Sequence, residues 1–81
     1  MSRIIDGKKK NLIGENLKKI RKIKGFSQQD LSDKLELLGV YVCRGSISRI
    51  EEYERTVTDI ELYAFSKVLD IDMLLLIDGG E

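Results

Sequence analysis

Four polar residues near the middle of the chain could do chemistry together: Arg44, Ser46, Ser48 and Arg49. A helix that begins near Cys43 carries them on its outer face, because the same periodicity turns Ile47 and Ile50 inward. Guanidinium and hydroxyl groups bind partners through hydrogen bonds. The chain has no His, one Cys and no glycine-rich phosphate loop, so neither a zinc site nor a nucleophile with its base can be assembled from it. The pattern therefore indicates a binding protein without metal or cofactor, not an enzyme.

The segment that must position this face runs from Phe26 to Glu51 and is typical of two short helices joined by a tight connection. Ser27 is predicted to cap the first helix, because its hydroxyl can accept a hydrogen bond from the free amide of Asp30. Apolar residues then recur at helical spacing: Leu31, Leu35 and Leu38. Gly39 is predicted to end this helix in a left-handed conformation. Two helices this short cannot fold alone, so the rest of the chain must bury their apolar faces.

Three further helices are predicted around this pair. One spans about residues 11 to 24, and its inner stripe consists of Ile13, Leu17, Ile20 and Ile23. Arg21 lies beside that stripe as a partly buried cation that needs a carboxylate partner. Another helix begins at Thr58, which can form a capping box with Glu61, and a short last helix spans Met73–Ile77. The predicted fold class is all-α, a compact five-helix domain.

The length of 81 residues fits one domain. We expect a flexible basic arm at residues 1–10, the helical domain at residues 11–77 and a tail at residues 78–81. The single Cys excludes an internal disulfide, and we assign Cys43 no redox role. The longest apolar run, residues 73–77, is too short to span a bilayer, and the N-terminus lacks the apolar core of a signal peptide. We therefore expect a cytoplasmic protein that does not enter a membrane.

Charge is distributed unevenly along the chain although the net charge is zero. Residues 1–25 hold nine basic and two acidic side chains, a net charge of +7. Residues 56–81 hold one basic and six acidic side chains, a net charge of −5. This asymmetry suggests that the basic end meets a polyanion, and solvated helix faces are the other interpretation of the same charges.

Three blocks together resemble the Cro and phage-repressor (XRE) type of helix-turn-helix DNA-binding domain: IGENLKKIRKIKGFSQQDL, SISRIE and VTDIELYAFSKVLDI. The resemblance extends from about Leu12 to Leu76. It implies a lambda-repressor-like domain whose third helix lies in the major groove of double-stranded DNA. It also implies a sequence-specific transcriptional regulator, a repressor that occupies an operator. The 81 residues leave no room for a ligand-sensing domain, so we expect no small-molecule ligand.

The resemblance assigns base contacts to Arg44, Gly45, Ser46, Ser48 and Arg49. Arg offers two parallel donors to the guanine edge and Ser is a permissive partner, although Ser46 could equally satisfy helix amides. Phosphate contacts are assigned to Gln28, Gln29, Arg55 and, through the arm, to Lys8, Lys9 and Lys10. The three arm lysines could equally be solvated without touching DNA. The resemblance also pairs Arg21 with Glu51 in a structural ion pair.

The sequence departs from the family in the middle of the domain. The connection ELLGVYV is longer than the usual short turn between the second and third helices. Tyr53 stands where a Gly commonly supports a left-handed turn, a change that costs ~1 kcal/mol. The loop EEYERTV contains three Glu and one Arg, which predicts few phosphate contacts and a shallow dependence of binding on salt.

The run MLLLI carries more apolar side chains than one face of a short helix can bury. We expect a homodimer through Met73, Leu74, Leu76 and Ile77. Such a dimer would place two recognition helices about one DNA turn apart, whereas the other interpretation is that this run only closes the core. The alternative function is a protein-interaction module of the same fold, such as the antitoxin of a toxin–antitoxin pair, which the acidic C-terminal half favours.

Overall fold

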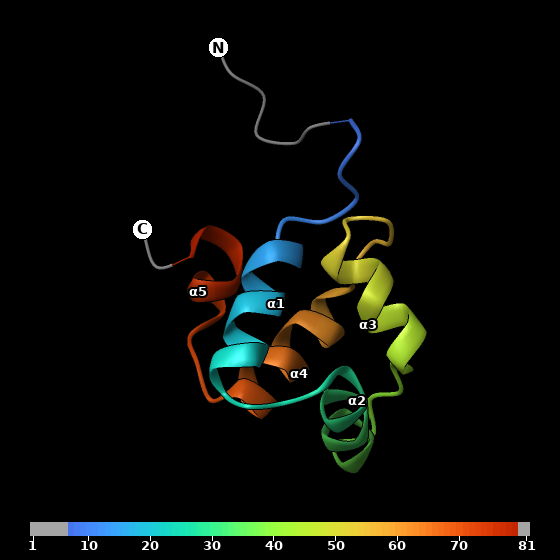
Figure 1. Ribbon diagram of the computed structural model, residues 1–81, viewed down its shortest axis with the longest axis vertical. Coiled ribbons are helices and arrows are strands. Elements are labelled where there is room, and N and C mark those ends of the chain that lie inside the picture. The colour runs from blue at the N-terminus through green and yellow to red at the C-terminus, as the bar shows by residue number, and fades with distance from the viewer. Residues whose placement is uncertain (1–6, 80–81) are drawn as a thin grey trace.

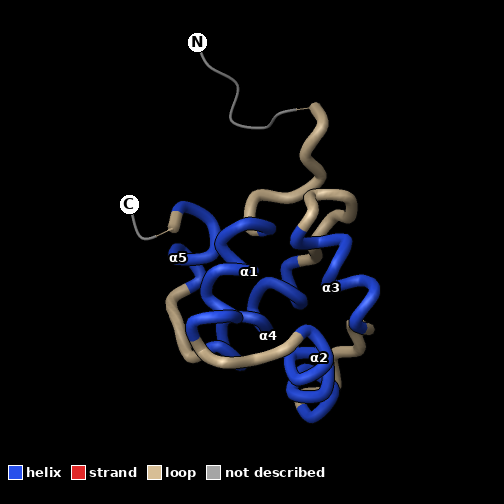
Figure 2. The backbone as a smooth tube through the Cα atoms, viewed as in Figure 1, coloured by secondary structure: helices blue, strands red, loops and turns tan. Residues whose placement is uncertain are grey.

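The computed structural model describes residues 7–79, and these residues form five α-helices. In chain order they are α1 (Gly14–Ile23), α2 (Gln28–Leu37), α3 (Arg44–Glu51), α4 (Asp59–Leu69) and α5 (Met73–Asp78). Helix α1 packs against α3 and α5, α2 packs against α3 and α4, and α4 also packs against α5 (Figures 1 and 2). No strand occurs in residues 7–79, so the predicted all-α class is confirmed.

The predicted arm and tail fall partly on residues 1–6 and 80–81, which lie outside the described residues. The described part of the arm leaves the domain beside the loop that follows α3, as Figure 1 shows. The described chain ends just after α5.

One apolar core joins the five helices. Its largest fully buried side chains are Phe65, Leu17, Leu31, Leu35, Ile47, Ile50, Leu69 and Leu76. Phe65 is the only aromatic side chain among these eight and comes from α4. Burying side chains of this size is worth about 1.5–3 kcal/mol each, which short helices need because their own hydrogen bonds do not hold them in water. The core therefore fixes the orientation of α3, whose Ile47 and Ile50 contribute to it.

The predicted caps at Ser27 and Thr58 and the predicted stop at Gly39 are confirmed. The Ser27 hydroxyl accepts from the Asp30 amide at 2.9 Å, and the Asp30 carboxylate accepts from the Ser27 amide at 2.9 Å. Thr58 and Glu61 form the same reciprocal pair at the start of α4, at 3.1 and 3.0 Å. Gly39 has a φ of +81°, the left-handed conformation expected after α2. Each cap satisfies backbone amides that have no partner inside their helix.

Two predicted core positions are wrong. Ile23 is 81% exposed, because Arg21, four residues after Leu17, takes the inward position in the last turn of α1 and is only 6% exposed. Leu38 is 54% exposed because α2 ends at Leu37, so the helical spacing no longer applies to the residue that follows. Helix α1 also begins at Gly14 instead of about residue 11.

Asn11 explains the late start of α1. Its side-chain oxygen accepts from the amides of Ile13 and Gly14, at 3.0 and 2.8 Å, so residues 11–13 form a turn ahead of the helix. Its side-chain amide donates to the carbonyls of Ile50 and Arg55, at 3.0 and 2.8 Å. One side chain thus ties the start of α1 to the end of α3 and to the loop after it.

Gly14 permits the close approach of the same two helices. A Cβ atom at this position would lie 2.5 Å from the carbonyl oxygen of Ile50 and 3.0 Å from that of Glu51. Only a residue without a side chain fits there without moving the backbone of α3. The close contact at Gly14 therefore fixes the distance between the start of α1 and the end of α3.

Candidate nucleic-acid interface

Helix α3 has one side buried in the core and the other side exposed to solvent. Ile47 and Ile50 are fully buried, whereas the guanidinium-bearing side chains of Arg44 and Arg49 are exposed. Gly45 is also exposed and has no atom within 4 Å of the place a Cβ would take. Ser46 and Ser48 are half-buried at the edges of this face. The five residues expected to contact bases thus share one side of an eight-residue helix.

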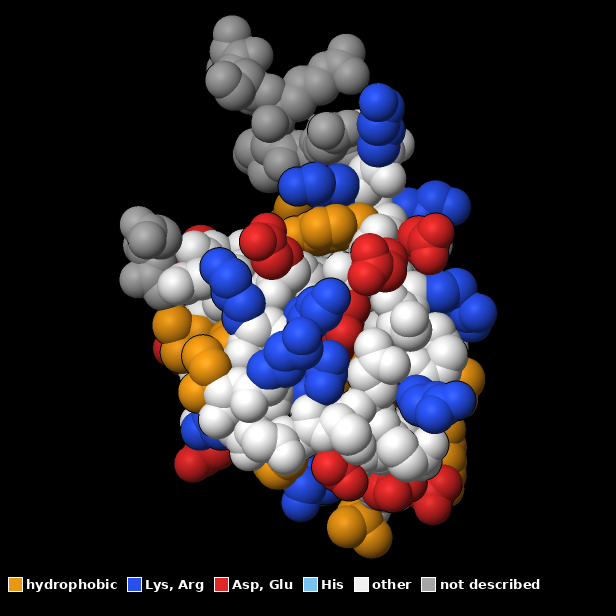
Figure 3. All heavy atoms as spheres, viewed as in Figure 1, with side chains coloured by type: hydrophobic (Ala, Val, Ile, Leu, Met, Phe, Trp, Pro, Cys, Tyr) orange, Lys and Arg blue, Asp and Glu red, His pale blue; other side chains and the backbone are white. Residues whose placement is uncertain are grey.

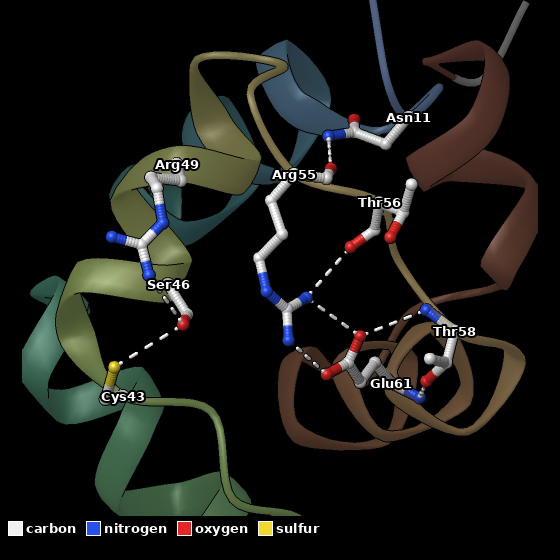
Figure 4. A network of polar contacts seen from close by, with 8 residues as sticks. All are labelled: Asn11, Cys43, Ser46, Arg49, Arg55, Thr56, Thr58 and Glu61. Atoms are coloured by element: carbon white, nitrogen blue, oxygen red, sulfur yellow. Dashed lines mark hydrogen bonds and ion pairs between the residues drawn. The ribbon is translucent and has the colours of Figure 1, made fainter.

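Ser46 links the first turn of α3 to Arg49. Its hydroxyl lies 3.4 Å from the Cys43 sulfur and 3.4 Å from Nη2 of Arg49, which donates to it (Figure 4). The proximity of the Ser46 side chain and backbone lowers the pKa of the Cys43 thiol. Cys43 itself makes no side-chain cap for the helix. The contact directs the Arg49 side chain back along the outer face of α3.

The N-terminus of α2 carries the two glutamines expected to contact phosphate. Gln28 is half-buried, and its side-chain amide donates to Oε1 of Glu51 at 3.0 Å. Gln29 is exposed, and its amide donates to Asp33 at 2.9 Å. Gln28 therefore lies where α2 meets the end of α3, whereas Gln29 is bonded within its own helix.

Arg21 and Glu51 form a buried ion pair beneath this junction. Nε and Nη2 of Arg21 donate to the two carboxylate oxygens of Glu51 at 2.7 and 3.1 Å, and Nη1 donates to the Phe26 carbonyl at 2.8 Å. Both side chains are almost inaccessible, 8% for Arg21 and 1% for Glu51. Together with Gln28, the pair fixes α1, α2 and α3 relative to one another by bonds with strict directions.

Arg55 is engaged by the protein itself. Its guanidinium donates to both carboxylate oxygens of Glu61, at 3.0 and 2.8 Å, and to the Thr56 carbonyl at 2.9 Å (Figure 4). These bonds raise the pKa of Arg55 and lower that of Glu61, in each case against the opposing effect of burial. The Arg55 side chain is 29% exposed, so most of its surface faces the protein.

Two of the described arm lysines, Lys9 and Lys10, contact Tyr53. The ammonium of Lys9 lies 4.6 Å from the centre of the Tyr53 ring, and the Lys10 amide donates to the Tyr53 carbonyl at 3.1 Å. Lys8, Lys9 and Lys10 are all exposed. In Figure 3, Lys and Arg side chains gather over α1 and along the edge beside α3, while Asp and Glu side chains cover the lower end of α2.

Helix α5 presents part of its apolar run to solvent. Met73, Leu74 and Ile77 are 39%, 60% and 37% exposed. Leu76 is fully buried in the core of its own chain, so its side chain is not available to a partner in this arrangement. The Leu76 carbonyl accepts from the Asn16 side chain at 3.0 Å, which holds α5 against α1. An apolar surface of three residues remains uncovered.

Three residues that position the interface carried no clear signal in the sequence. Asn11 and Gly14 act through contacts with the far end of α3, and the Tyr53 hydroxyl accepts from the Glu15 amide at 3.2 Å. Each contact joins residues 36 or more positions apart, which no local spacing could show. Two hints were available: an Asn stands just before an apolar stripe, and Asn favours helix starts, while Tyr53 stands where a Gly is common.

Two further properties concern the described part of the chain. Within residues 7–79, no group of three or more His, Cys, Asp or Glu side chains is placed to hold a metal ion. None of the five helices described above is both long and apolar enough to cross a membrane.

Comparisons with known proteins agree with this geometry. A sequence profile of the helix-turn-helix family matches residues 17–76, about three quarters of the chain. A similar solved structure is that of the restriction-modification controller protein C.AhdI from Aeromonas hydrophila, which is 26% identical. The superposition covers 79% of this chain and 89% of that protein, with a TM-score of 0.69. A search of curated protein sequences gives no match.

Proposed function

This chain belongs to the helix-turn-helix family of DNA-binding transcription regulators, of the Cro and phage-repressor type, and from that premise we propose that it represses transcription by occupying a specific operator. The similar solved structure is a controller of restriction and modification. From this similarity we infer only that the present chain is also a transcription regulator. The genes under control would be those beside the operator.

The outward face of α3 carries this proposal. Arg44 and Arg49 are exposed on a helix whose opposite side is locked into the core, so the face can enter the major groove without unfolding. An Arg side chain can donate to O6 and N7 of one guanine, which is worth about 1–3 kcal/mol of discrimination. Gly45 allows the helix to approach the bases, and Ser46 and Ser48 supply short hydrogen-bonding groups at its margins.

Phosphate contacts would hold α3 in register. Gln28 and Gln29 lie at the N-terminus of α2, where free backbone amides also favour an anion. Lys8, Lys9 and Lys10 add exposed positive charge, and Lys9 and Lys10 contact Tyr53 just after the C-terminal end of α3. Arg55 contributes least, because Glu61 and Thr56 already occupy its guanidinium. Such contacts position the protein without reading sequence.

A two-fold dimer would give the operator its symmetry. Met73, Leu74 and Ile77 form an exposed apolar surface on α5, and joining two such surfaces would remove them from water. A dimer repeats the recognition helix, so half-sites would be about one DNA turn apart. Leu74→Ser should shift the protein toward the monomer in sedimentation and weaken operator binding. Dimers of unchanged stability in this variant would contradict the role of α5.

A protein-interaction module, such as an antitoxin, is the second candidate function. The same apolar surface on α5 supports it, because a partner protein could cover Met73, Leu74 and Ile77 as well as a second copy could. The exposed acidic side chains of Glu52 and Glu54 in the loop after α3 would also repel DNA phosphates. Under this alternative, substitutions on α3 should leave the main activity intact.

Selection of bound genomic fragments followed by footprinting tests the proposal. Purified protein is expected to retain a shared two-fold symmetric site at moderate salt. Arg44→Ala and Arg49→Ala should each weaken binding to that site by about 1–3 kcal/mol. Lys67→Ala removes the same charge from the exposed face of α4, and it should change affinity little. Retention of no common sequence, or equal effects of all three variants, would refute operator recognition by α3.

A further inference from the structure

Tyr53 holds a backbone conformation that few side chains adopt. Its φ is +63°, in the left-handed region, directly after α3 and the capping residue Glu52. A Gly would adopt this conformation without cost, so the Tyr side chain is kept at the expense of backbone strain. Strain of this kind persists when the side chain does something that Gly cannot.

The Tyr53 residue makes three contacts with the segment that precedes and opens α1. Its carbonyl accepts from the Lys10 amide at 3.1 Å, and its hydroxyl accepts from the Glu15 amide at 3.2 Å. The Lys9 ammonium sits over its ring, 4.6 Å from the centre. A Cβ at Gly14 would come within 3.1 Å of the same ring. Tyr53 therefore fastens the basic segment to the end of α3.

The loop after α3 has little positive charge of its own to offer. Glu52 and Glu54 are exposed, and the loop's single cation, Arg55, is bound by Glu61 and by the Thr56 carbonyl. Besides Lys18, which lies 4.0 Å from Glu52, the nearby cations come from the segment before α1, through the contacts of Lys9 and Lys10 with Tyr53. Figure 1 shows this segment running beside the loop that follows α3.

We propose that Tyr53 is a positioning residue that docks Lys8–Lys10 at the C-terminal end of α3, where these lysines bind DNA phosphates in place of the acidic loop. The proposal rests on the DNA-binding function proposed above. A lysine ammonium over an aromatic face keeps N–H donors on the side away from the ring, so Lys9 can be held and still bind phosphate. Holding the segment in place beforehand lowers the entropy lost when it binds.

The salt dependence of DNA binding tests this role. Each lost phosphate contact should reduce the slope of log affinity against log salt by about 0.9. Tyr53→Gly relieves the strain and removes the ring beneath Lys9 and the hydroxyl bonded to Glu15, while the carbonyl that accepts from the Lys10 amide remains. It should stay folded, bind a short mixed-sequence duplex about tenfold more weakly at low salt, and lose about 2 units of slope. Substitution of Lys8, Lys9 and Lys10 by Ala together removes all three proposed phosphate contacts and should lower the slope by about 2.7 units.

A double-mutant comparison separates docking from other effects. If Tyr53 acts through the lysines, Tyr53→Gly should add little to the triple lysine variant. Tyr53→Phe keeps the ring under Lys9 and should bind nearly as the parent chain does. Asp70→Gly is the matched control, because Asp70 is the other described non-Gly residue with positive φ, at +54°, and lies at the end of α4. It should leave the slope unchanged.

The outcomes distinguish this inference from the function on which it rests. Unchanged affinity and slope in Tyr53→Gly would overturn the docking role, and Arg49→Ala would still report operator binding by α3. Absence of DNA binding in the parent chain would remove both proposals. If Tyr53→Gly fails to fold, Tyr53→Asn replaces it, since Asn tolerates the left-handed conformation and lacks the ring. Full additivity with the lysine variant would also refute the proposal.

Discussion

Arg21 and Glu51 are joined by two hydrogen bonds, at 2.7 and 3.1 Å, across the interior between α1 and α3. Neither charge reaches solvent to any extent, and the Arg21 guanidinium is also bonded to the Phe26 carbonyl. Glu51 in turn accepts from Gln28. The candidate phosphate-binding end of α2 is thus held through Glu51, the last residue of α3.

We expect Arg21→Ala and Glu51→Ala each to lower the free energy of unfolding by about 3–5 kcal/mol, because each leaves one buried charge without its partner. The double variant Arg21→Met, Glu51→Leu should cost much less than the sum, since apolar side chains can fill the site. Urea denaturation measures both. Lys18→Ala is the control: its exposed pair with Glu52 spans 4.0 Å and should contribute less than about 1 kcal/mol. Equal effects at the two pairs would contradict this account.

Two glycines should respond in opposite directions to the same substitution. Gly14→Ala places a Cβ 2.5 Å from the Ile50 carbonyl oxygen and should lower stability by about 1–3 kcal/mol through forced backbone shifts. Gly45→Ala meets no atom within 4 Å and should raise stability by up to about 1 kcal/mol, since Ala favours the helix. Thermal unfolding of the two variants beside the parent chain gives the answer. Destabilisation by Gly45→Ala would show that α3 is held differently.

The parts of the fold that sequence could predict depend on local chemistry. The capping boxes at Ser27 and Thr58 and the left-handed Gly39 use residues at most three positions apart, so their spacing was enough. The helical period failed where a helix ended early, at Leu38, and where a charged residue took the buried position, as Arg21 did ahead of Ile23. The number of helices and their caps were therefore predictable, whereas the exact helix ends and the core positions next to them were not.

The candidate interface also has some features that the sequence could predict and others that it could not. The residues on the outer face of α3 followed from periodicity, and the pairing of Arg21 with Glu51 followed from the family resemblance. The sequence could not show that Glu61 already binds Arg55, or that Tyr53 meets Lys9. The second contact joins residues distant in the chain, and a Glu three residues after a cap has several partners within reach. Only packing decides among them.

Stability should depend on pH through Glu61. The Arg55 guanidinium lowers the pKa of this carboxyl below its ordinary value of 4.5, burial opposes the shift, and the Thr58 amide adds to it. Because the folded pKa is the lower one, this contribution is complete above pH 4.5 and is lost as the pH falls toward the folded pKa. The free energy of unfolding should therefore decrease below pH 4.5.

Glu61→Gln should flatten that decrease while lowering stability at neutral pH. Its amide cannot replace the charge-assisted pair with Arg55, whose side chain is 29% exposed. Asp30, whose pKa is lowered by bonds from Ser27, will retain part of the acid dependence, so Asp30→Asn serves as the comparison. Denaturant titrations at several pH values below neutral measure the slopes. An unaltered pH profile in Glu61→Gln would exclude the Glu61 pair as its source.

Asn11 offers the sharpest test of how the end of α3 is held. Its side chain makes four hydrogen bonds: two accepted from the amides of Ile13 and Gly14, and two donated to the carbonyls of Ile50 and Arg55. The first pair stabilises the start of α1, and the second pair joins that start to α3 and its loop. An Asp at this position would keep the acceptor and lose both donors.

We therefore expect Asn11→Ala to lower the free energy of unfolding by about 2–3 kcal/mol, since it removes the helix-start bonds and leaves two carbonyls without their donor. Asn11→Asp should keep the helix start but set a carboxylate against the carbonyls of Ile50 and Arg55, so it should be about as damaging despite its similar shape. Asn16→Asp, which removes one donor to the Leu76 carbonyl, is the matched control and should cost about half as much. Denaturation by urea ranks the three variants, and amide exchange at the end of α3 reports where the loss occurs. If Asn11→Asp proved as stable as the parent chain, the hydrogen bonds from Asn11 to α3 and its loop would contribute nothing, and only Gly14 and the Arg21–Glu51 pair would fix the position of α3 relative to α1.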